Sequence, residues 1–147
     1  MVKNNYASSI EEAFHKYLST AKIDKISRKK LPPKTCIELI HMAGGVAVLA
    51  HPCSLKIKQV DIHDQVRLLK YYGLDGIEAF HPDLSQKYVS FCRKLAAEFD
   101  LIVTCGSDFH GLDVKRDVFL AKGSKDNLPT YDESIVEELI NAINRRR

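Results

Sequence analysis

The sequence predicts an α/β protein built on a parallel β-sheet. Three short apolar runs, within VAVLAHP, LDGIEAFHP and LIVTCGSDFHG, each follow a segment with helical periodicity. An unbroken apolar run directly after a helix-ending glycine is typical of a parallel strand that is buried on both faces. Repeated helix-then-strand order is typical of α/β architectures, and it leaves both a barrel and an open sheet possible.

The N-terminal residues predict a short amphipathic helix followed by a connector. SSIEEAFHKYL places a glutamate three residues after either Ser8 or Ser9, which is the pattern of a capped helix start. Its apolar residues then recur at helical spacing. Residues 19–33 are basic and end in Pro32-Pro33, which disfavours helix and indicates an exposed connector.

The remaining chain predicts helix–strand repeats. Helical patterns occupy TCIELIHMAGG, VDIHDQVRLLKYYG, LSQKYVSFCRKLAAEFD and YDESIVEELINAINRRR, and VFLAKG is a weaker strand candidate. With 147 residues, the chain is long enough for one core and short for two. We therefore expect a single domain over 1–147, with a helix and basic connector in 1–33 and the repeats in 34–147.

Composition narrows the class of protein. Hydrophobic residues make up 45% and charged residues 28%, as in folded globular proteins. No apolar run approaches the roughly 18 residues of a membrane span, and the first residues lack the apolar stretch of a secretory signal. The four cysteines form no CxxC pair, which favours reduced thiols. We expect a cytoplasmic protein without a membrane partner.

The charge is uneven along the chain. Residues 1–35 contain eight lysines and arginines against three acidic residues. Such a segment attracts polyanions such as RNA. No nucleic-acid-binding motif and no interleaved aromatic residues accompany it, so an RNA-binding module ranks last among the functions considered.

Polar side chains follow all three predicted strands. His51 ends the first, His81 ends the second, and Asp108 and His110 follow the third. Parallel α/β folds build their sites at the carboxyl ends of strands. Each histidine alone could be a buried imidazole satisfied by a carbonyl group, but together these residues predict a divalent metal site suited to a phosphoester. Alternation along an extended stretch points Asp108 and His110 the same way and Glu78 away from His81, which favours a supporting role for Glu78.

The three motifs AGGVAVLAHP, GLDGIEAFHP and LIVTCGSDFHG, in this order, resemble the second half of the PHP (polymerase and histidinol phosphatase) family. The nearest branch is that of RNase AM and nucleoside 3′,5′-bisphosphate phosphatases, and SSIEEAFHKYL is similar to the helix that precedes its AHP segment. The resemblance covers roughly residues 8–111.

The resemblance implies a partial distorted (β/α) barrel with parallel strands and the N-terminal strands missing. It implies a metal-dependent phosphoesterase that hydrolyses nucleotides or nucleic-acid ends with metal-activated water, using Mn, Zn, Mg or Fe. By position, His81, Asp108 and His110 match metal ligands, Asp108 and His110 are the catalytic candidates, and His51 is a substrate-binding candidate that contacts phosphate.

The sequence departs from the family in lacking a His-x-His motif. Most first-half ligands of a PHP domain are therefore absent, and three or four strands are too few for a closed barrel. Exposed sheet edges then require cover by a second copy or by a complementing N-terminal fragment. The alternative is a truncated, catalytically inactive remnant that serves as a binding or structural module, so enzymatic activity is left open at this point.

Overall fold

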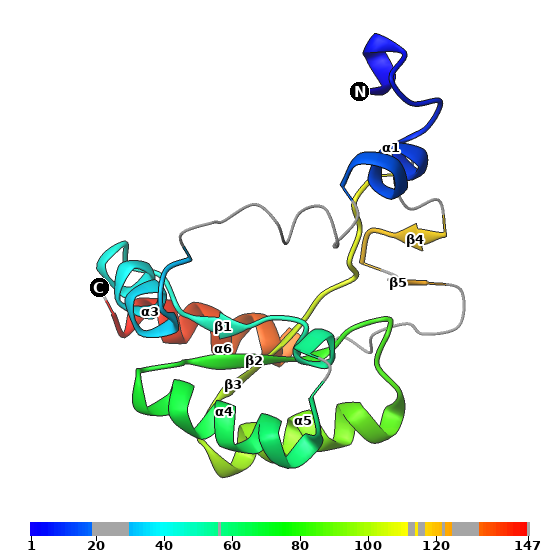
Figure 1. Ribbon diagram of the computed structural model, residues 1–147. Helices are drawn as coiled ribbons and strands as arrows, with labels where there is room; N and C mark the ends of the chain where they lie inside the picture. The colour runs from blue at the N-terminus through cyan, green and yellow to red at the C-terminus, as the bar shows by residue number, and fades with distance from the viewer. Residues whose placement is uncertain are drawn as a thin grey trace. The chain divides into compact units, whose positions relative to one another are not determined.

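A computed structural model describes residues 1–18, 30–55, 57–111, 114, 117–121, 123–124 and 133–146 (Figure 1). The chain forms two compact units, Met1–Leu31 and Pro32–Arg147. Most of the predicted basic connector, residues 19–29, lies outside the described residues.

The first unit contains helix α1 (Ile10–Tyr17), preceded by a 3₁₀ turn (Val2–Asn4). Ser9 is the N-cap: its side chain accepts a hydrogen bond from the Glu12 backbone N–H at 3.0 Å. The Glu12 carboxylate reaches back and accepts from the Ser8 backbone N–H at 2.7 Å. These reciprocal bonds satisfy helix-end donors, and they confirm the helix predicted from the serine pair.

A three-stranded parallel sheet organises the second unit. Its strands are β1 (Val48–Leu49), β2 (Gly76–Phe80) and β3 (Ile102–Cys105), in the order β1-β2-β3. Gly76 pairs with Val48 on one side and Ile102 on the other. A Cβ atom on Gly76 would lie 2.6 Å from the Ile102 Cγ1 atom, so only glycine allows this close approach. The predicted α/β fold with a parallel sheet is confirmed.

The described residues of this unit also form the helices α3 (Pro33–Met42), α4 (Gln59–Tyr71), α5 (Gln86–Glu98) and α6 (Glu133–Asn144). In Figure 1, α4 and α5 lie on one side of the sheet and α6 on the other. The core joins α3, α4, α5 and the sheet through buried apolar side chains, which are Ile37, Ala47, Ile62, Val66, Leu74, Ile77, Ala79, Cys92, Leu95, Ala96 and Leu101. Their burial is the main stabilising term for this unit.

The weak strand candidate VFLAKG has a different role from the three main strands. It contains β4 (Val118–Phe119), which pairs antiparallel with β5 (Gly123–Ser124) in a separate two-stranded sheet. The sequence pattern identifies an extended segment here but does not say which sheet it joins.

Asp75 ties several elements together at the amino end of β2. Its carboxylate accepts hydrogen bonds from the Ala47 backbone N–H at 2.7 Å and from His41 Nε2 at 2.8 Å, and it pairs with the Arg146 guanidinium. These partners come from α3, the segment before β1 and the residues after α6. Asp75 therefore stabilises the fold at this end of the sheet by bonding to three separate segments.

Within the described part of the chain, no helix is long and apolar enough to cross a membrane.

Candidate metal centre

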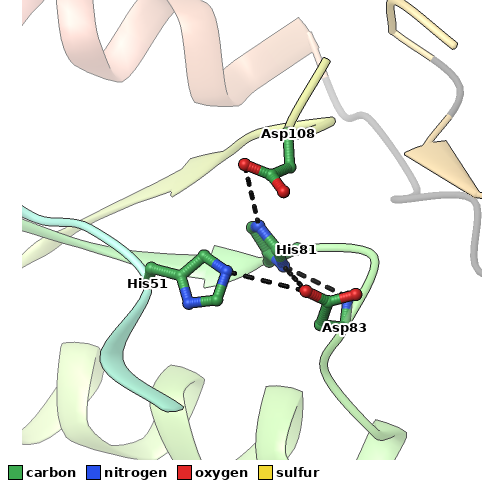
Figure 2. Close-up of side chains that lie close together, drawn as sticks. All are labelled: His51, His81, Asp83 and Asp108. Atoms are coloured by element: carbon green, nitrogen blue, oxygen red, sulfur yellow. Dashed lines mark hydrogen bonds and ion pairs between the residues drawn. The ribbon is translucent and has the colours of Figure 1, made fainter. Parts of the chain in front are cut away.

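The strand-end residues converge at the carboxyl edge of the sheet (Figure 2). His51 follows β1, His81 directly follows β2, and Asp108 lies three residues beyond β3. Together with Asp83, each of these residues offers one ligand atom within 4.8 Å of the others. The parallel topology brings together three segments that are far apart in the sequence.

His81 lies at the centre of this group and is only 5% exposed. Its Nδ1 atom accepts a hydrogen bond from the Asp83 backbone N–H at 3.1 Å. On the other side of the ring, Nε2 lies 3.9 Å from Asp108 Oδ1 and has no hydrogen-bond partner. A buried polar atom without a partner costs free energy, so such atoms are rare and call for an explanation.

His51 packs against His81 in an unusual backbone conformation. The two ring centroids are 3.9 Å apart with an interplanar angle of 71°, and His51 Nε2 lies 3.7 Å from Asp83 Oδ2. The φ angle of His51 is 51°, in the left-handed region that few residues other than glycine adopt. The His51 backbone N–H donates to Glu78 Oε2 at 2.7 Å.

Asp83 joins the group although the sequence reasoning did not select it. It stands two residues after His81, in the motif HPD, and its side chain is 62% exposed. The carboxylate lies 3.9 Å from His81 Nδ1. The sequence did contain a signal for Asp83, since it is a carboxylate only two residues after a strand-end histidine. A short turn at this place folds back onto the same edge of the sheet.

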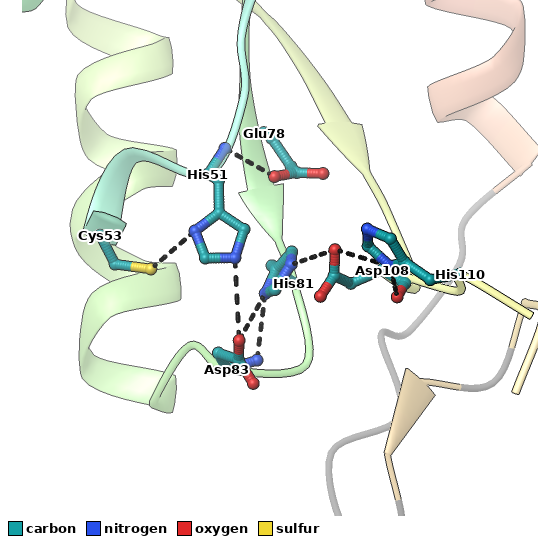
Figure 3. Close-up of polar contacts among 7 residues, drawn as sticks. All are labelled: His51, Cys53, Glu78, His81, Asp83, Asp108 and His110. Atoms are coloured by element: carbon teal, nitrogen blue, oxygen red, sulfur yellow. Dashed lines mark hydrogen bonds and ion pairs between the residues drawn. The ribbon is translucent and has the colours of Figure 1, made fainter. Parts of the chain in front are cut away.

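Asp108 and His110 are arranged differently from the expectation of an extended stretch. Asp108 has a φ angle of 54°, so simple alternation does not apply after β3. Its carboxylate faces His81, whereas the His110 side chain is 53% exposed and lies outside the group of four (Figure 3). The His110 ring bonds through Nδ1 to the Asp108 carbonyl oxygen at 2.7 Å, which assigns the Nδ1 proton and leaves Nε2 with a lone pair. Metal ligation by His110 stays a prediction.

The cysteines are free thiols, as expected from their spacing. Cys53 Sγ lies 3.5 Å from His51 Nδ1. Burial and the nearby Asp83 and Glu78 carboxylates raise the pKa of the Cys53 thiol, and burial raises the pKa of Cys92 to about 12. Both thiols therefore stay protonated at neutral pH and are unsuited to act as nucleophiles.

The arrangement of donor atoms fits a divalent cation. Tetrahedral bonds of roughly 2.0–2.2 Å from an ion to imidazole nitrogen and carboxylate oxygen place two ligand atoms roughly 3.3–3.6 Å apart. The separations of His51 from Asp83 and of His81 from Asp108, 3.7 and 3.9 Å, are slightly longer than this and exceed hydrogen-bond lengths. A small movement of the side chains would bring these atoms to ligand distances. Because His81 Nδ1 accepts from the Asp83 N–H, the neutral ring carries its proton on Nε2. A cation bound at Nε2 would displace this proton to Nδ1 and replace the bond from the Asp83 N–H.

Solved structures place this fold among those of metal-dependent phosphoesterases. A crystal structure from Bifidobacterium adolescentis described as a metal-dependent phosphoesterase matches with a TM-score of 0.69 and 26% identity, over 95% of this chain and 46% of that one. An amidohydrolase from Chromobacterium violaceum, with sulfate bound, shares the fold with a TM-score of 0.65 and 23% identity, over 93% of this chain and 48% of that one.

Three curated enzymes are similar to this chain in sequence. A phosphoribosyl 1,2-cyclic phosphate 1,2-diphosphodiesterase of Eggerthella lenta is 40% identical over 78 residues, which are 53% of this chain and 28% of that protein. A 5′-3′ exoribonuclease of Haemophilus influenzae is 31% identical over 110 residues, and the exoribonuclease Rnm of Escherichia coli is 30% identical over 115. Each match covers 75% of this chain and 40% or 38% of the relative, respectively.

The chain thus spans less than half the length of these relatives. No family model matches it. The resemblance to metal-dependent phosphoesterases of the PHP type, recognised in the three strand-end motifs, is confirmed over part of their length.

Proposed function

We propose that this chain carries part of the active site of a PHP-type phosphoesterase, which hydrolyses phosphoesters of nucleotides or RNA ends with the help of divalent metal ions. The observation that carries the proposal is the buried, unpaired His81 Nε2 atom facing the Asp108 carboxylate at the carboxyl edge of the sheet. The similarity to phosphodiesterase and exoribonuclease sequences supports the reaction class.

The metal ligands that we propose are His81, Asp108 and Asp83, with His110 joining them after rotation of its exposed ring. A bound divalent ion would polarise the phosphoester and increase the acidity of water. His81 is well suited to ligation because burial and the packed His51 ring fix its position. The Asp108 carboxylate would orient the attacking water and accept its proton.

The two more exposed histidines contact the substrate in this proposal. His110 carries its proton on Nδ1, so it has one lone pair, on Nε2. When His110 does not ligate the ion, this lone pair can take over the water proton from Asp108 and pass it to the leaving oxygen. His51 presents Nε2 beside Asp83 at the rim of the group and would hold a phosphate oxygen when protonated. A 5′-terminal RNA phosphate or a phosphorylated nucleotide supplies such oxygens, and two of the relatives are named as 5′-3′ exoribonucleases.

Full activity in this proposal needs the ligands of the first half of the metal site, which an N-terminal segment would supply. Among the described residues, β1 and β3 each pair with β2 alone, so both are edge strands. Apolar side chains are also exposed on α3 and α6, including Met42 at 83% and Val136 at 58%. These features support association with an N-terminal fragment or with a second copy. Free thiols support a reducing compartment, and we propose the cytoplasm.

The test is hydrolysis of a 5′-phosphorylated oligoribonucleotide and a nucleoside 3′,5′-bisphosphate with added Mn²⁺. The purified chain should turn over slowly, because three or four ligands cannot hold two ions well. Addition of a fragment with the His-x-His half should raise the rate, and Asp108→Ala should abolish the increase. Asp61→Ala, an exposed carboxylate change on α4, is the matched control and should leave the rate unchanged.

Robust turnover that survives Asp108→Ala would contradict the proposed site. Metal binding without turnover, even with the added fragment, would instead favour the alternative of an inactive binding module.

A further inference from the structure

Glu78 lies within β2 but touches the segments that follow both neighbouring strands. Its Oε2 atom accepts a hydrogen bond from the His51 backbone N–H, at 2.7 Å, in the segment after β1. Its Oε1 atom lies against Gly106, directly after β3, where an added Cβ atom would collide with it. The Glu78 carboxylate therefore bonds to the segment after β1 and lies next to the segment after β3. Figure 3 shows its bond to the His51 N–H beside the candidate metal centre.

A β-bulge explains how Glu78 reaches this place. Alternation along a regular strand puts Glu78 and His81 on opposite faces. The pairing of β2 with β3 shifts instead: Glu78 pairs with Thr104, and Phe80 pairs with the very next residue, Cys105. The extra residue in β2 changes the alternation, so that Glu78 and His81 both contact His51.

His51 needs such support more than an ordinary strand residue does. Its left-handed backbone, with a φ of 51°, persists only where the surroundings hold it in place. The bond from its N–H to a carboxylate is charge-assisted and stronger than a bond to a neutral acceptor. The same residue places its ring 3.9 Å from the His81 ring and its Nε2 3.7 Å from Asp83. Loss of the bond would release both contacts.

We propose that Glu78 is a positioning residue: it holds the His51 backbone so that the imidazole ring orders the His81 and Asp83 side chains, and Gly106 leaves the space that its carboxylate needs. This inference rests on the proposed function, because that function says what the site is for. The bond from the His51 N–H to Glu78 can nevertheless be tested without any measurement of catalysis. Glu78 acts through His51 and does not contact the substrate.

The first test measures hydrogen exchange of the His51 amide by NMR in the purified full chain without added metal. The amide should be protected in the wild type, exchange faster in Glu78→Ala and Gly106→Ala, and keep part of its protection in Glu78→Gln, whose amide oxygen still accepts. Asp75→Asn is the matched control. Asp75 accepts a backbone N–H at the same 2.7 Å distance, from Ala47, at the other end of β2, so its variant should leave His51 protected.

The second test titrates the same proteins with Co²⁺ alone and follows its visible absorption. Glu78→Ala and Gly106→Ala should bind Co²⁺ about 10- to 100-fold more weakly than the wild type, as is usual when a residue that orients a ligand is removed. Glu78→Gln should recover part of the affinity, and Asp75→Asn should bind normally. A general loss of folding would instead weaken binding in the Asp75 variant as well.

Two results would overturn the inference: a His51 amide that exchanges freely in the wild type, or Co²⁺ affinity that is unchanged in both Glu78→Ala and Gly106→Ala. Hydrolysis that requires Asp108 but ignores Glu78 would also overturn it while leaving the proposed function intact. Conversely, a protected His51 amide that depends on Glu78, in a chain without phosphoesterase activity even with the added fragment, would support the positioning bond and reject the proposed function.

Discussion

The two ends of the central sheet carry the same kinds of side chain but pair them differently. At the amino end, the Asp75 carboxylate accepts from His41 and the Ala47 N–H within 2.8 Å and also pairs with Arg146. At the carboxyl end, His81 and Asp108 lie 3.9 Å apart, and His81 Nε2 is buried without a partner. Histidine and aspartate at hydrogen-bond distance stabilise the fold, whereas the same residues held slightly farther apart leave room for a ligand.

Left-handed backbone occurs at both ends of the sheet, since Asp100, before β3, has a φ of 48°. At the carboxyl end it falls on two residues of the candidate site, His51 and Asp108, with φ angles of 51° and 54°. Left-handed conformations cost free energy in residues other than glycine, and they cluster at functional sites. What distinguishes the carboxyl end is that this strain coincides with a buried polar atom without a partner.

The largest effect should come from replacing the Asp108 carboxylate. Asp108→Asn should lower the rate of phosphoester hydrolysis, measured with the complementing fragment and Mn²⁺, by about 10²-fold or more, because it removes a metal-ligating oxygen and a proton acceptor. The melting temperature should change little, since the amide has nearly the same shape. A rate within about threefold of the wild type would remove Asp108 from the mechanism.

Replacement of Asp75 should instead act on stability. Asp75→Ala should lower the free energy of unfolding by about 3 kcal/mol, because Arg146, His41 and the Ala47 N–H lose their shared acceptor in a partly buried place. Urea unfolding followed by circular dichroism measures this change. Co²⁺ affinity of the folded variant should equal that of the wild type, and a change above about tenfold would contradict the division between the two ends.

Replacement of His81 should show the opposite pattern. His81→Leu removes a buried, unpaired nitrogen, which offsets the loss of the bond from the Asp83 N–H. The free energy of unfolding should therefore stay within about 1 kcal/mol of the wild type. Co²⁺ binding should be lost. A destabilisation as large as that of Asp75→Ala would mean that His81 serves the fold rather than the site.

Low pH should decrease the free energy of unfolding through Asp75 at the amino end of the sheet. This effect should be smaller than those of the substitutions above. Burial opposes ionisation of Asp75, but the bonds from Arg146, the Ala47 N–H and His41 outweigh it, and the pKa of Asp75 lies below its ordinary value. A lowered pKa in the folded state contributes stability above the unfolded pKa of about 4, and this stability is lost as the pH falls through the folded value. Urea unfolding between pH 6 and pH 3 should show a smaller decrease in Asp75→Asn than in the wild type.

The sequence predicted the layout of the fold because apolar runs and helical periodicity depend on local patterns. Among the described residues it located β1, β2, β3 and the helices α1, α3, α4, α5 and α6, and it identified His51, His81 and Asp108 as strand-end residues that the structure brings together. It did not predict the antiparallel pairing of β4 with β5, because pairing partners depend on tertiary contacts.

The finer geometry of the site lay beyond pattern reasoning for a physical reason. The bulge after Glu78 and the left-handed backbone of Asp108 both break the alternation on which side-chain directions were predicted. Glu78 consequently reaches His51, and Asp108 faces His81 while His110 turns outward. Asp83 was missed because a tight turn, rather than a strand, carries it back to the site.

Isothermal titration of the purified chain with Mn²⁺ tests the difference between the two ends of the sheet most directly. Binding should be detectable in the wild type and in Asp75→Asn, and it should be lost in both His81→Leu and Asp108→Asn. Equal binding by all four proteins, or binding that disappears only in Asp75→Asn, would show that the carboxyl end of the sheet is not a metal centre.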